Sequence, residues 1–423
     1  MRGSPSDQPI VSPLGTLADG VVGAAGEHGT LVLDLAGIEI DWWIGADDAW
    51  HLPSEGAGRA VRPGRAPAVD ARVRVPGGEV VLRGYACAGS PVPWVVADLE
   101  NESPGPVVVA WVLRAAPGYR IGRVALDGTT LRIDDRALVT LPRAPLRWAV
   151  EPRARGVRER VLGGDAASGS FEPVAARRGD LEVAVLFPLA HRTRTRIAAA
   201  TALPGATSVA VAQLPSADDV ERGWDASLDQ RGMRVELPEE ALDRAVDAAR
   251  VTLMLGGGRD RLVAAASGAW GLDEGRDRAA DVREDPWPRL RATAEPAGAT
   301  ARGAAEWLLA VRDALLRVED DDVVMLPSFP VEWLGQPVAV HDAPTALGPV
   351  SFALRWHGAR PALLWDIPER LSLRAPALDA AWSGVGGNGE ALLAEVDASR
   401  LLSLGSAAPV VSGAVVDEPG SFS

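Results

Sequence analysis

Short apolar segments follow one another about every ten residues through the first half of the 423-residue chain, and Gly, Pro and Asp separate them. Residues 71–86 show the plan most clearly, because alternating apolar residues flank the turn sequence Pro-Gly-Gly at 76–78. Residues 93–114 repeat it around a second polar turn. This spacing is typical of antiparallel sheets rather than of βαβ units. We therefore expect a β-sandwich domain over residues 15–215, after a disordered N-terminus at 1–14.

The pattern changes after the sandwich to one that is typical of helices. Ser216 is placed to cap a helix that continues to about residue 232. Apolar stripes at helical spacing predict two more helices, over 238–255 and 301–318. The acidic stretch between these two, which contains several Pro and Gly residues, is expected to form a partly helical connector or a flexible loop. Residues 216–320 should therefore contain three to four helices.

Strand patterns return after this helical segment. Residues 344–366 (PTALGPVSFALRWHGARPALLWD) predict a hairpin that turns at 358–360, with one apolar face and one polar or small face. We expect a β-sandwich-like domain over 321–405, followed by a frayed tail at 406–423. The predicted fold class is mainly β with a helical segment. It comprises an N-terminal antiparallel β-sandwich, a short middle of three to four helices and a C-terminal β-sandwich-like domain.

The charge and the missing residue types exclude several functions. A net charge of −14 argues against binding to nucleic acid or to an anionic membrane, and no apolar run approaches the ~20 residues that span a bilayer. All 43 basic residues are arginine, so no lysine-dependent chemistry is available. The N-terminus lacks the basic start and apolar core of a secretory signal, and we expect a cytoplasmic protein. The single cysteine, Cys87, is expected to be a small buried hydrophobe.

Fourteen of the 21 aromatic residues are tryptophans (with five Phe and two Tyr), and some of them stand beside carboxylates. The segment 41–51 (DWWIGADDAWH) contains our first candidate carbohydrate-binding residues, which are Trp42, Trp43, Asp47, Asp48, Trp50 and His51. Indole rings stack on the C–H faces of sugars and carboxylates accept hydrogen bonds from hydroxyl groups, so this combination suits a sugar groove. The alternative is a strand with one tryptophan turned inward, because adjacent Trp42 and Trp43 point to opposite faces of a strand.

A second group of polar and aromatic residues surrounds the predicted C-terminal hairpin. Its candidate carbohydrate-binding residues are Glu332, Trp333, His341, Asp342 and His357. Histidine and carboxylate side chains can also perform acid–base catalysis or bind a metal. However, two histidines sixteen residues apart lack a metal-ligand spacing, and no metal site is predicted. A hydrogen-bonded network that holds a loop to the sheet is the favoured interpretation.

Other acidic and glycine-rich segments are interpreted as structural. We expect six acidic residues of the middle segment to form a solvated charged run: Asp273, Glu274, Asp277, Asp281, Glu284 and Asp285. Residues 319–322 (EDDD) are expected to form an exposed turn. The sequence GVGGNG at 384–389 matches a dinucleotide-binding pattern, but no βαβ context surrounds it, and we interpret it as a turn. No catalytic residue is assigned and no cofactor is expected.

Three segments resemble those of the uncharacterised actinobacterial six-hairpin glycosidase-like proteins. They are 41–53 (DWWIGADDAWHLP), 326–366 (LPSFPVEWLGQPVAVHDAPTALGPVSFALRWHGARPALLWD) and 381–393 (AWSGVGGNGEALL). The resemblance implies that an N-terminal β-sandwich and a C-terminal β domain flank an (α/α)6 barrel of twelve helices. Such a barrel needs roughly 200 residues at ordinary helix and loop lengths, whereas residues 238–327 number 90. We therefore expect the barrel to be missing or strongly reduced, with 216–320 as a helical linker or its remnant.

These observations favour a non-catalytic, glycoside-hydrolase-like protein that binds carbohydrate or has an accessory role. One alternative is an active glycoside hydrolase that uses carboxylates of the β domains, such as Asp47 with Asp48 or Glu332 with Asp342. Another alternative is a structural or interaction scaffold without a small ligand. The expected partners are a carbohydrate or another protein, and neither a nucleic acid nor a membrane.

Overall fold

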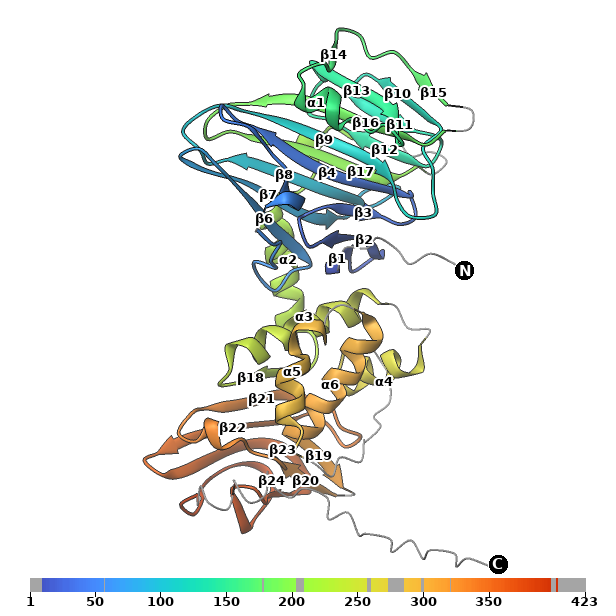
Figure 1. Cartoon of the computed structure of the whole chain (residues 1–423). Coiled ribbons are helices and arrows are strands. Elements are labelled where there is room, and N and C mark those ends of the chain that lie inside the picture. The colour runs from blue at the N-terminus through green and yellow to red at the C-terminus, as the bar shows by residue number, and fades with distance from the viewer. Residues whose placement is uncertain are drawn as a thin grey trace, which may run out of the picture. The chain divides into compact units, whose positions relative to one another are not determined.

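The chain divides into two compact units. Its structure, a computed structural model, describes residues 10–56, 58–176, 179–202, 209–256, 260–272, 285–297, 300–319, 321–396 and 401. Unit 1 comprises residues 1–232, 241–276 and 293–308, and unit 2 comprises 233–240, 277–292 and 309–423. Figure 1 labels the helices and strands of both units.

Unit 1 contains two antiparallel sheets. Sheet A has nine strands, which are β1 (Ile10–Thr16), β2 (Gly20–Gly26), β3 (Leu31–Leu33), β4 (Ile38–Gly45), β5 (Trp50–His51), β9 (Val107–Ala115), β13 (Arg147–Pro152), β14 (Ala167–Ser168) and β16 (Leu181–Leu189). Their order is β1-β2-β3-β4-β9-β16-β13-β14, with β5 paired to β4. Sheet B has eight strands, which are β6 (Ala68–Val75), β7 (Gly78–Cys87), β8 (Trp94–Asn101), β10 (Arg123–Asp127), β11 (Thr130–Ile133), β12 (Ala137–Thr140), β15 (Val174–Ala175) and β17 (Arg194–Thr201). Their order is β15-β10-β11-β12-β17-β8-β7-β6.

The two sheets enclose one apolar core, so the predicted N-terminal antiparallel β-sandwich is confirmed. Alternation along each strand turns one set of side chains inward; in β7, for example, Val80 and Leu82 belong to the core. Trp42 of β4 lies opposite Trp111 of β9, and both are buried in this core. Each large apolar side chain that is fully buried contributes about 1.5–3 kcal/mol to folding. The predicted hairpin at 71–86 is confirmed as β6 and β7.

Six α-helices are described, and five of them follow the sandwich. They are α1 (Arg158–Leu162), α2 (Ala217–Gln230), α3 (Glu240–Leu255), α4 (Arg261–Ala269), α5 (Trp287–Ala297) and α6 (Ala301–Leu315). Three short 3-10 helices are η1 (Pro53–Glu55), η2 (Val211–Gln213) and η3 (Val331–Trp333). Helix α2 corresponds to the helix predicted from its cap at Ser216, and α3 and α6 correspond to the two that apolar spacing predicts. Helix α6 ends at Leu315 rather than near residue 318, because the residues after it pair with another strand.

Unit 2 contains a single described sheet, sheet C. Its seven strands are β18 (Arg234–Glu236), β19 (Leu316–Glu319), β20 (Asp322–Met325), β21 (Val338–Ala343), β22 (Val350–His357), β23 (Arg360–Ala375) and β24 (Asp379–Leu392). Their order is β18-β21-β22-β23-β20-β19, with β24 paired to β23, and only β20 and β23 run parallel among the described pairs. Hydrogen bonds from Trp287 of α5 to Ser328 O (3.1 Å) and from Arg312 of α6 to Pro344 O (3.0 Å) hold these helical residues to the segments that follow β20 and β21. The second sheet of the predicted sandwich-like domain is not found among the described residues of unit 2.

The fold class, mainly β with a helical segment, is confirmed, but several details differ from the sequence analysis. Five helices, α2 to α6, are described between residues 216 and 320 rather than the predicted three to four. The turn predicted at 384–389 is wrong, because these residues form part of β24. Gly389 lies directly opposite Trp365 of β23, and a Cβ atom at Gly389 would collide with that indole ring. The glycines therefore allow β24 to pair beside bulky neighbours. Residues 10–14, expected to be disordered, form part of β1, whereas 1–9 and the predicted tail at 406–423 lie outside the described residues.

Candidate functional site

Two tryptophans of the first predicted group are buried. Trp42 and Trp43 in β4 are 0% and 2% exposed, and they belong to apolar clusters on opposite faces of sheet A. Trp42 Nε1 donates a hydrogen bond to His28 O (3.2 Å). Trp43 Nε1 donates to Asp41 Oδ2 (3.2 Å). Neither ring face is free to stack on a sugar.

The other four residues of this group lie around β5. Asp47 and Asp48 are exposed in the loop between β4 and β5, and Trp50 and His51 are half-buried. The Trp50 ring lies against Gly45 of the paired strand. His51 Nε2 lies 2.9 Å from Asp48 Oδ1, and this hydrogen bond lowers the pKa of Asp48. The carboxylate of Asp48 is therefore already occupied by His51.

Trp333 and Glu332, from the second predicted group, belong to a network at the edge of unit 2. Trp333 is fully buried, its ring centroid lies 4.3 Å from that of Trp287, and its Nε1 donates to Glu239 Oε1 (2.6 Å). Arg291 binds the same carboxylate with Nε and Nη2 and lowers the pKa of Glu239. Glu332 is exposed, and one of its oxygens lies 3.4 Å from Arg291 Nη2. These contacts hold η3 to α5 and to Glu239 rather than to the strands of sheet C.

The remaining residues of the second group lie on β21 and β22. His341 Nε2 lies 3.3 Å from Glu236 Oε1, and Asp342 Oδ2 lies 3.3 Å from Arg234 Nη2. His357 is exposed at the end of β22, beside the turn that separates it from β23. Of the five residues in this group, His341 is the one that lines a hollow described below.

The acidic runs have structural surroundings where they are described. Five residues of the predicted solvated run lie outside the described residues: Asp273, Glu274, Asp277, Asp281 and Glu284. Asp285 Oδ1 accepts a hydrogen bond from Ser328 Oγ (2.7 Å). At the predicted turn between β19 and β20, Glu319 and Asp322 form ion pairs with Arg374 (3.0 and 3.2 Å). These carboxylates are used for local stability.

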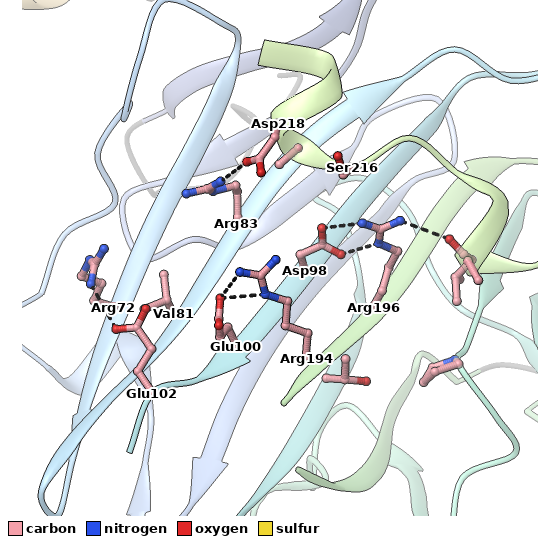
Figure 2. Close-up of a pocket in the computed structure, with 15 residues that line it drawn as sticks. Arg72, Val81, Arg83, Asp98, Glu100, Glu102, Arg194, Arg196, Ser216 and Asp218 are labelled. Carbon is pink, nitrogen blue, oxygen red and sulfur yellow. Dashed lines mark hydrogen bonds and ion pairs between the residues drawn. The ribbon is translucent and has the colours of Figure 1, made fainter. Parts of the chain in front are cut away.

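A hollow of about 370 Å³ on the outer face of sheet B is lined by arginines and carboxylates (Figure 2). We call it the arginine–carboxylate pocket, and its charged residues are Arg72, Arg83, Asp98, Glu100, Glu102, Arg194, Arg196 and Asp218. The strand register places them side by side. Arg196 of β17 lies opposite Asp98 of β8, which lies opposite Arg83 of β7, which lies opposite Asp70 of β6. Charge therefore alternates in sign across four strands, and such cross-strand pairs stabilise a sheet.

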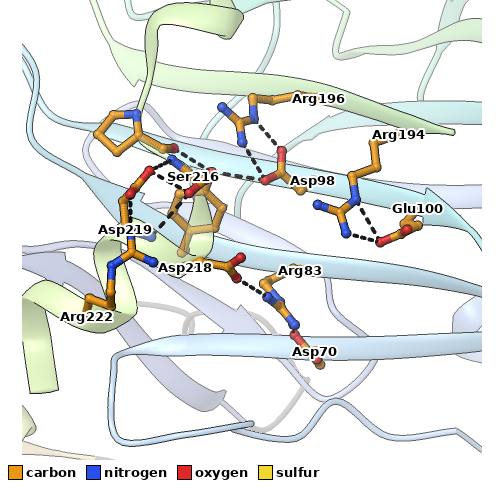
Figure 3. A network of polar contacts seen from close by, with 12 residues as sticks. Asp70, Arg83, Asp98, Glu100, Arg194, Arg196, Ser216, Asp218, Asp219 and Arg222 are labelled. Atoms are coloured by element: carbon orange, nitrogen blue, oxygen red, sulfur yellow. Dashed lines mark hydrogen bonds and ion pairs between the residues drawn. The ribbon is translucent and has the colours of Figure 1, made fainter.

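This row of charges also holds the segment that follows the sandwich (Figure 3). Arg196 Nη1 donates to the carbonyl oxygen of Leu214 (2.9 Å), just after η2. Arg83 Nη1 pairs with Asp218 Oδ1 (3.0 Å) in the first turn of α2. Beyond the row, an apolar cluster joins residues of sheet B to Val211, Leu214 and Ala217. The pocket therefore anchors η2 and the start of α2 to sheet B.

The charged groups of this pocket satisfy one another. Asp98 accepts from Arg196 Nη2 (2.7 Å), and Glu100 lies 2.7 Å from Arg194 Nη2. Four arginines and four carboxylates line the pocket, and its described lining includes no aromatic ring. A ligand would have to displace existing ion pairs to bind here. We interpret the arginine–carboxylate pocket as structural.

A second hollow, of about 530 Å³, lies on one face of sheet C. We call it the sheet C hollow, and it is lined by His341, Ser351, Phe352, Ala353, Leu364, Trp365, Asp366, Asn388, Gly389 and Glu390. These residues come from the four neighbouring strands β21, β22, β23 and β24. The strand register arranges their side chains in two rows.

One row is polar. Asp366 of β23 lies between Ser351 of β22 and Asn388 of β24, and His341 of β21 lines the hollow beside them. Asp366 and Asn388 are exposed, and Ser351 and His341 are half-buried. Together they offer a carboxylate, an amide, a hydroxyl and an imidazole to a ligand.

The neighbouring row is apolar in its middle. Leu364 of β23 lies between Ala353 of β22 and Glu390 of β24. Leu364 and Ala353 are half-buried, and Glu390 is exposed. Glu390 and Asp366 are diagonal neighbours on adjacent strands, which places their Cα atoms about 7–8 Å apart. The hollow therefore combines a small apolar floor with hydrogen-bonding groups at its rim.

The sequence analysis singled out His341 but not Asp366, Asn388 or Glu390. The alternation in residues 362–366 does indicate which side chains share a face. It does not indicate which strand lies beside β23 or in which register. Because residues 384–389 are predicted to form a turn, the sequence does not identify β24 as a neighbour of β23.

The described residues contain no group of three or more His, Cys, Asp or Glu side chains that could hold a metal ion. Within the same part of the chain, each helix is too short or too polar to cross a membrane.

Comparisons with known proteins show little similarity. No protein-family model and no curated protein matches this sequence. Among solved structures, a similar chain is that of a bacterial glucoamylase in complex with acarbose. The TM-score is 0.40 at 6% identity, over 63% of this chain and 44% of the glucoamylase chain. This chain thus spans less than half of that structure, and a TM-score this low does not establish a shared fold. The resemblance to six-hairpin glycosidase-like proteins stays a prediction.

Proposed function

We propose that this protein is a non-catalytic, glycoside-hydrolase-like protein that binds a carbohydrate in the sheet C hollow. The observation that supports this function is the pair of neighbouring rows, one polar and one apolar in its middle. A pyranose ring has the same division, with hydroxyl groups around its edge and C–H groups on its faces.

The proposed pose follows from this division. The C–H face of the sugar lies over Leu364 and Ala353, where it removes apolar surface from water. The hydroxyl groups donate to the Asp366 carboxylate and to the side-chain oxygen of Asn388, and accept from the Asn388 amide group. Aliphatic side chains thus take the place of the tryptophan platform that the sequence analysis gives as one candidate.

The exposure of the two carboxylates supports binding rather than hydrolysis. Glycoside hydrolysis needs a general acid that keeps its proton near neutral pH, and burial is a principal cause of such a raised pKa. Asp366 and Glu390 both occupy exposed positions, so neither lies in the enclosed environment in which such an acid is found.

An active glycoside hydrolase is the second candidate, because of one observation. Asp366 and Glu390 are diagonal neighbours, with Cα atoms about 7–8 Å apart. Inverting glycosidases use two carboxyl groups about 6.5–9.5 Å apart. Detection of reducing sugar released by the purified protein, and its loss in Glu390→Gln, would favour this candidate over the first.

A glycan array with the full chain, followed by isothermal titration calorimetry of each hit, tests the proposed function. We expect a carbohydrate whose affinity falls at least tenfold in Asn388→Ala, because the variant removes the amide that hydrogen-bonds the sugar hydroxyl groups. Asn388 is exposed, so this substitution should have little effect on stability. Trp50→Ala is the control, since it removes the half-buried indole of the first predicted group. Loss of binding in Trp50→Ala but not in Asn388→Ala would indicate that the carbohydrate binds at the first predicted group instead of the sheet C hollow. Absence of any hit would refute the proposal and favour the scaffold alternative.

The cytoplasmic location, and the absence of nucleic-acid and membrane partners, stay predictions from the sequence. A protein partner is the expectation of the scaffold alternative. Co-purification of a second protein in stable proportion, without a carbohydrate hit, would support it.

A further inference from the structure

We infer that the sheet C hollow prefers a sugar that carries a protonated amine, and this inference rests on the proposed function. Asp366 and Glu390 stand at the rim of the hollow, beside its apolar floor. Neither carboxylate forms a hydrogen bond or ion pair with a residue that the structure describes. The described lining of the hollow contains no arginine, although all 43 basic residues of the chain are arginine.

The strand register explains why these carboxylates lack a cationic neighbour. In the arginine–carboxylate pocket, Asp98 lies directly opposite Arg196, and Glu100 lies directly opposite Arg194. In sheet C, by contrast, Asp366 lies opposite Ser351 and Asn388, and Glu390 lies opposite Leu364. The same chain thus neutralises carboxylates on a structural sheet face and leaves two of them without a cross-strand cation in the hollow.

Basic side chains around the hollow are paired elsewhere or lie outside it. His341 lines the hollow, but its Nε2 lies 3.3 Å from Glu236 Oε1. Arg234 of β18 lies directly opposite His341, but its Nη2 lies 3.3 Å from Asp342 Oδ2 and it does not line the hollow. Arg355 is on the same face of β22 as Ser351, two positions beyond Ala353 and opposite Ala362, and it does not line the hollow. The hollow therefore presents a negative potential to a ligand, which favours a cation.

An amine on the sugar ring suits both carboxylates. A protonated amine has three N–H donors and can bind more than one carboxylate at once. Hydrogen bonds between an ammonium group and a carboxylate are about twice as strong as those between neutral groups. A hydroxyl group at the same ring position has a single donor and no charge, and an acetylated amine loses the charge as well. The preference should therefore follow the charge of this substituent.

Three β-1,4-linked tetrasaccharides that differ only at C2 test the inference: the glucosamine tetramer, the N-acetylglucosamine tetramer and cellotetraose. Titration calorimetry with the full chain, at low salt and a pH at which the amine is protonated, gives their affinities. We expect the glucosamine tetramer to bind at least tenfold more tightly than the other two. Added salt should reduce this preference, because it screens charges at exposed sites.

Matched variants distinguish the effect of the carboxylates in the hollow from the effect of the protein's overall negative charge. Glu390→Gln should lower the preference for the amine severalfold and leave the affinity for cellotetraose within about twofold. Asp366→Asn should also lower the preference, and it should weaken cellotetraose binding as well, because the sugar hydroxyl groups donate to Asp366. Glu369→Gln, which removes an exposed carboxylate of β23 outside the hollow, should leave the preference unchanged. An equal effect of all three variants would overturn the inference.

The failure of this inference and the failure of the proposed function give different results. Equal affinities for the three tetrasaccharides would overturn the amine preference and leave carbohydrate binding in place. Binding of none of them, together with an empty glycan array, would refute the proposed function and this inference with it.

Discussion

Tryptophan serves packing at most of the positions considered for ligand binding. Seven tryptophans are fully buried, namely Trp42, Trp43, Trp94, Trp111, Trp270, Trp287 and Trp333. A large indole is suited to a core when its N–H finds an acceptor, as Trp333 does at Glu239 and Trp270 at Leu308 O (2.9 Å). The abundance of tryptophan therefore reflects the interior of this protein, and the inward-facing alternative of the sequence analysis applies at these positions.

Trp333→Phe should lower the free energy of unfolding by about 1–3 kcal/mol, because a buried hydrogen bond to a carboxylate is lost. Trp356→Phe is the matched control. Trp356 Nε1 also donates a hydrogen bond, to Gln336 O (2.8 Å), but at an exposed position, and its loss should cost less than about 1 kcal/mol. Urea denaturation followed by circular dichroism gives both values, and equal losses would contradict this account.

The same network predicts a dependence of stability on acid. Hydrogen bonds from Arg291 hold the pKa of Glu239 below its usual value near 4.5. A lowered pKa stabilises the fold above the unfolded-state value, and this contribution is lost as pH falls through the folded-state value. Glu239→Gln should therefore destabilise the protein at neutral pH and make stability less dependent on pH below about 5. Denaturation midpoints over a pH series measure this; an unchanged slope in the variant would contradict it.

Cys87 is buried, as predicted, and burial raises the pKa of its thiol to about 11. Thiol reagents attack the thiolate, so Cys87 should react very slowly at neutral pH in the folded protein. Alkylation with iodoacetamide, followed by mass spectrometry, should show modification only in denaturant. Rapid modification of the native protein would contradict the buried position.

At the scale of elements, the start of α2 depends on local sequence. Ser216 Oγ accepts a hydrogen bond from the backbone N–H of Asp219 (3.2 Å), and Asp219 Oδ2 accepts one from the backbone N–H of Ser216 (3.1 Å). This reciprocal capping box satisfies two backbone donors that a helix otherwise leaves unpaired. Its residues are three positions apart, so the helix start was predictable without any tertiary contact.

Ser216→Ala should lower the free energy of unfolding by about 0.5–2 kcal/mol. Ser227→Ala, in the same helix, is the control. Ser227 is half-buried and its Oγ donates back to Gly223 O (2.8 Å), and alanine there should be neutral or slightly stabilising, by less than about 0.5 kcal/mol. Thermal unfolding followed by circular dichroism compares the two; a larger loss from Ser227→Ala would be inconsistent with the capping role.

Strand β24 shows where local pattern is not enough. Its glycines favour a turn when the sequence is considered alone, but in the sheet Gly389 lies opposite Trp365 of β23, where a Cβ atom would collide with the indole ring. The role of Gly389 thus depends on a neighbour more than twenty positions away in the chain. The sheet C hollow was missed for the same reason.

At the scale of the whole molecule, one cluster joins a loop of the sandwich unit to two of its helices. Arg65, between β5 and β6, pairs with Asp229 of α2 and with Asp247 of α3, both at 2.7 Å. Asp247 also pairs with Arg250 (3.1 Å), which is 2% exposed and donates to Leu228 O (2.8 Å). Asp247 is therefore the acidic partner of a buried guanidinium group.

Asp247→Asn should destabilise unit 1 by about 3–5 kcal/mol, because it leaves Arg250 buried without its carboxylate. Asp229→Asn is the matched control, since Asp229 is more exposed and pairs with the same Arg65. An exposed pair contributes about 0–1 kcal/mol, so this variant should be close to the unchanged protein. Chemical denaturation of the full chain compares them, and similar losses in both variants would refute the distinction.

Features that depend on short-range chemistry follow from the sequence alone. These are the hairpin around the Pro-Gly-Gly turn, the cap at Ser216, the mainly β fold class and the helical segment that follows the sandwich. Which strands are neighbours, and in which register, depends on the tertiary fold. That choice turned Trp42 and Trp333 into core residues, paired the charges of the arginine–carboxylate pocket and brought Asp366 beside Asn388. The physical reason is that alternation along a strand assigns each side chain to a face, whereas its neighbours on that face come from segments far away in the chain.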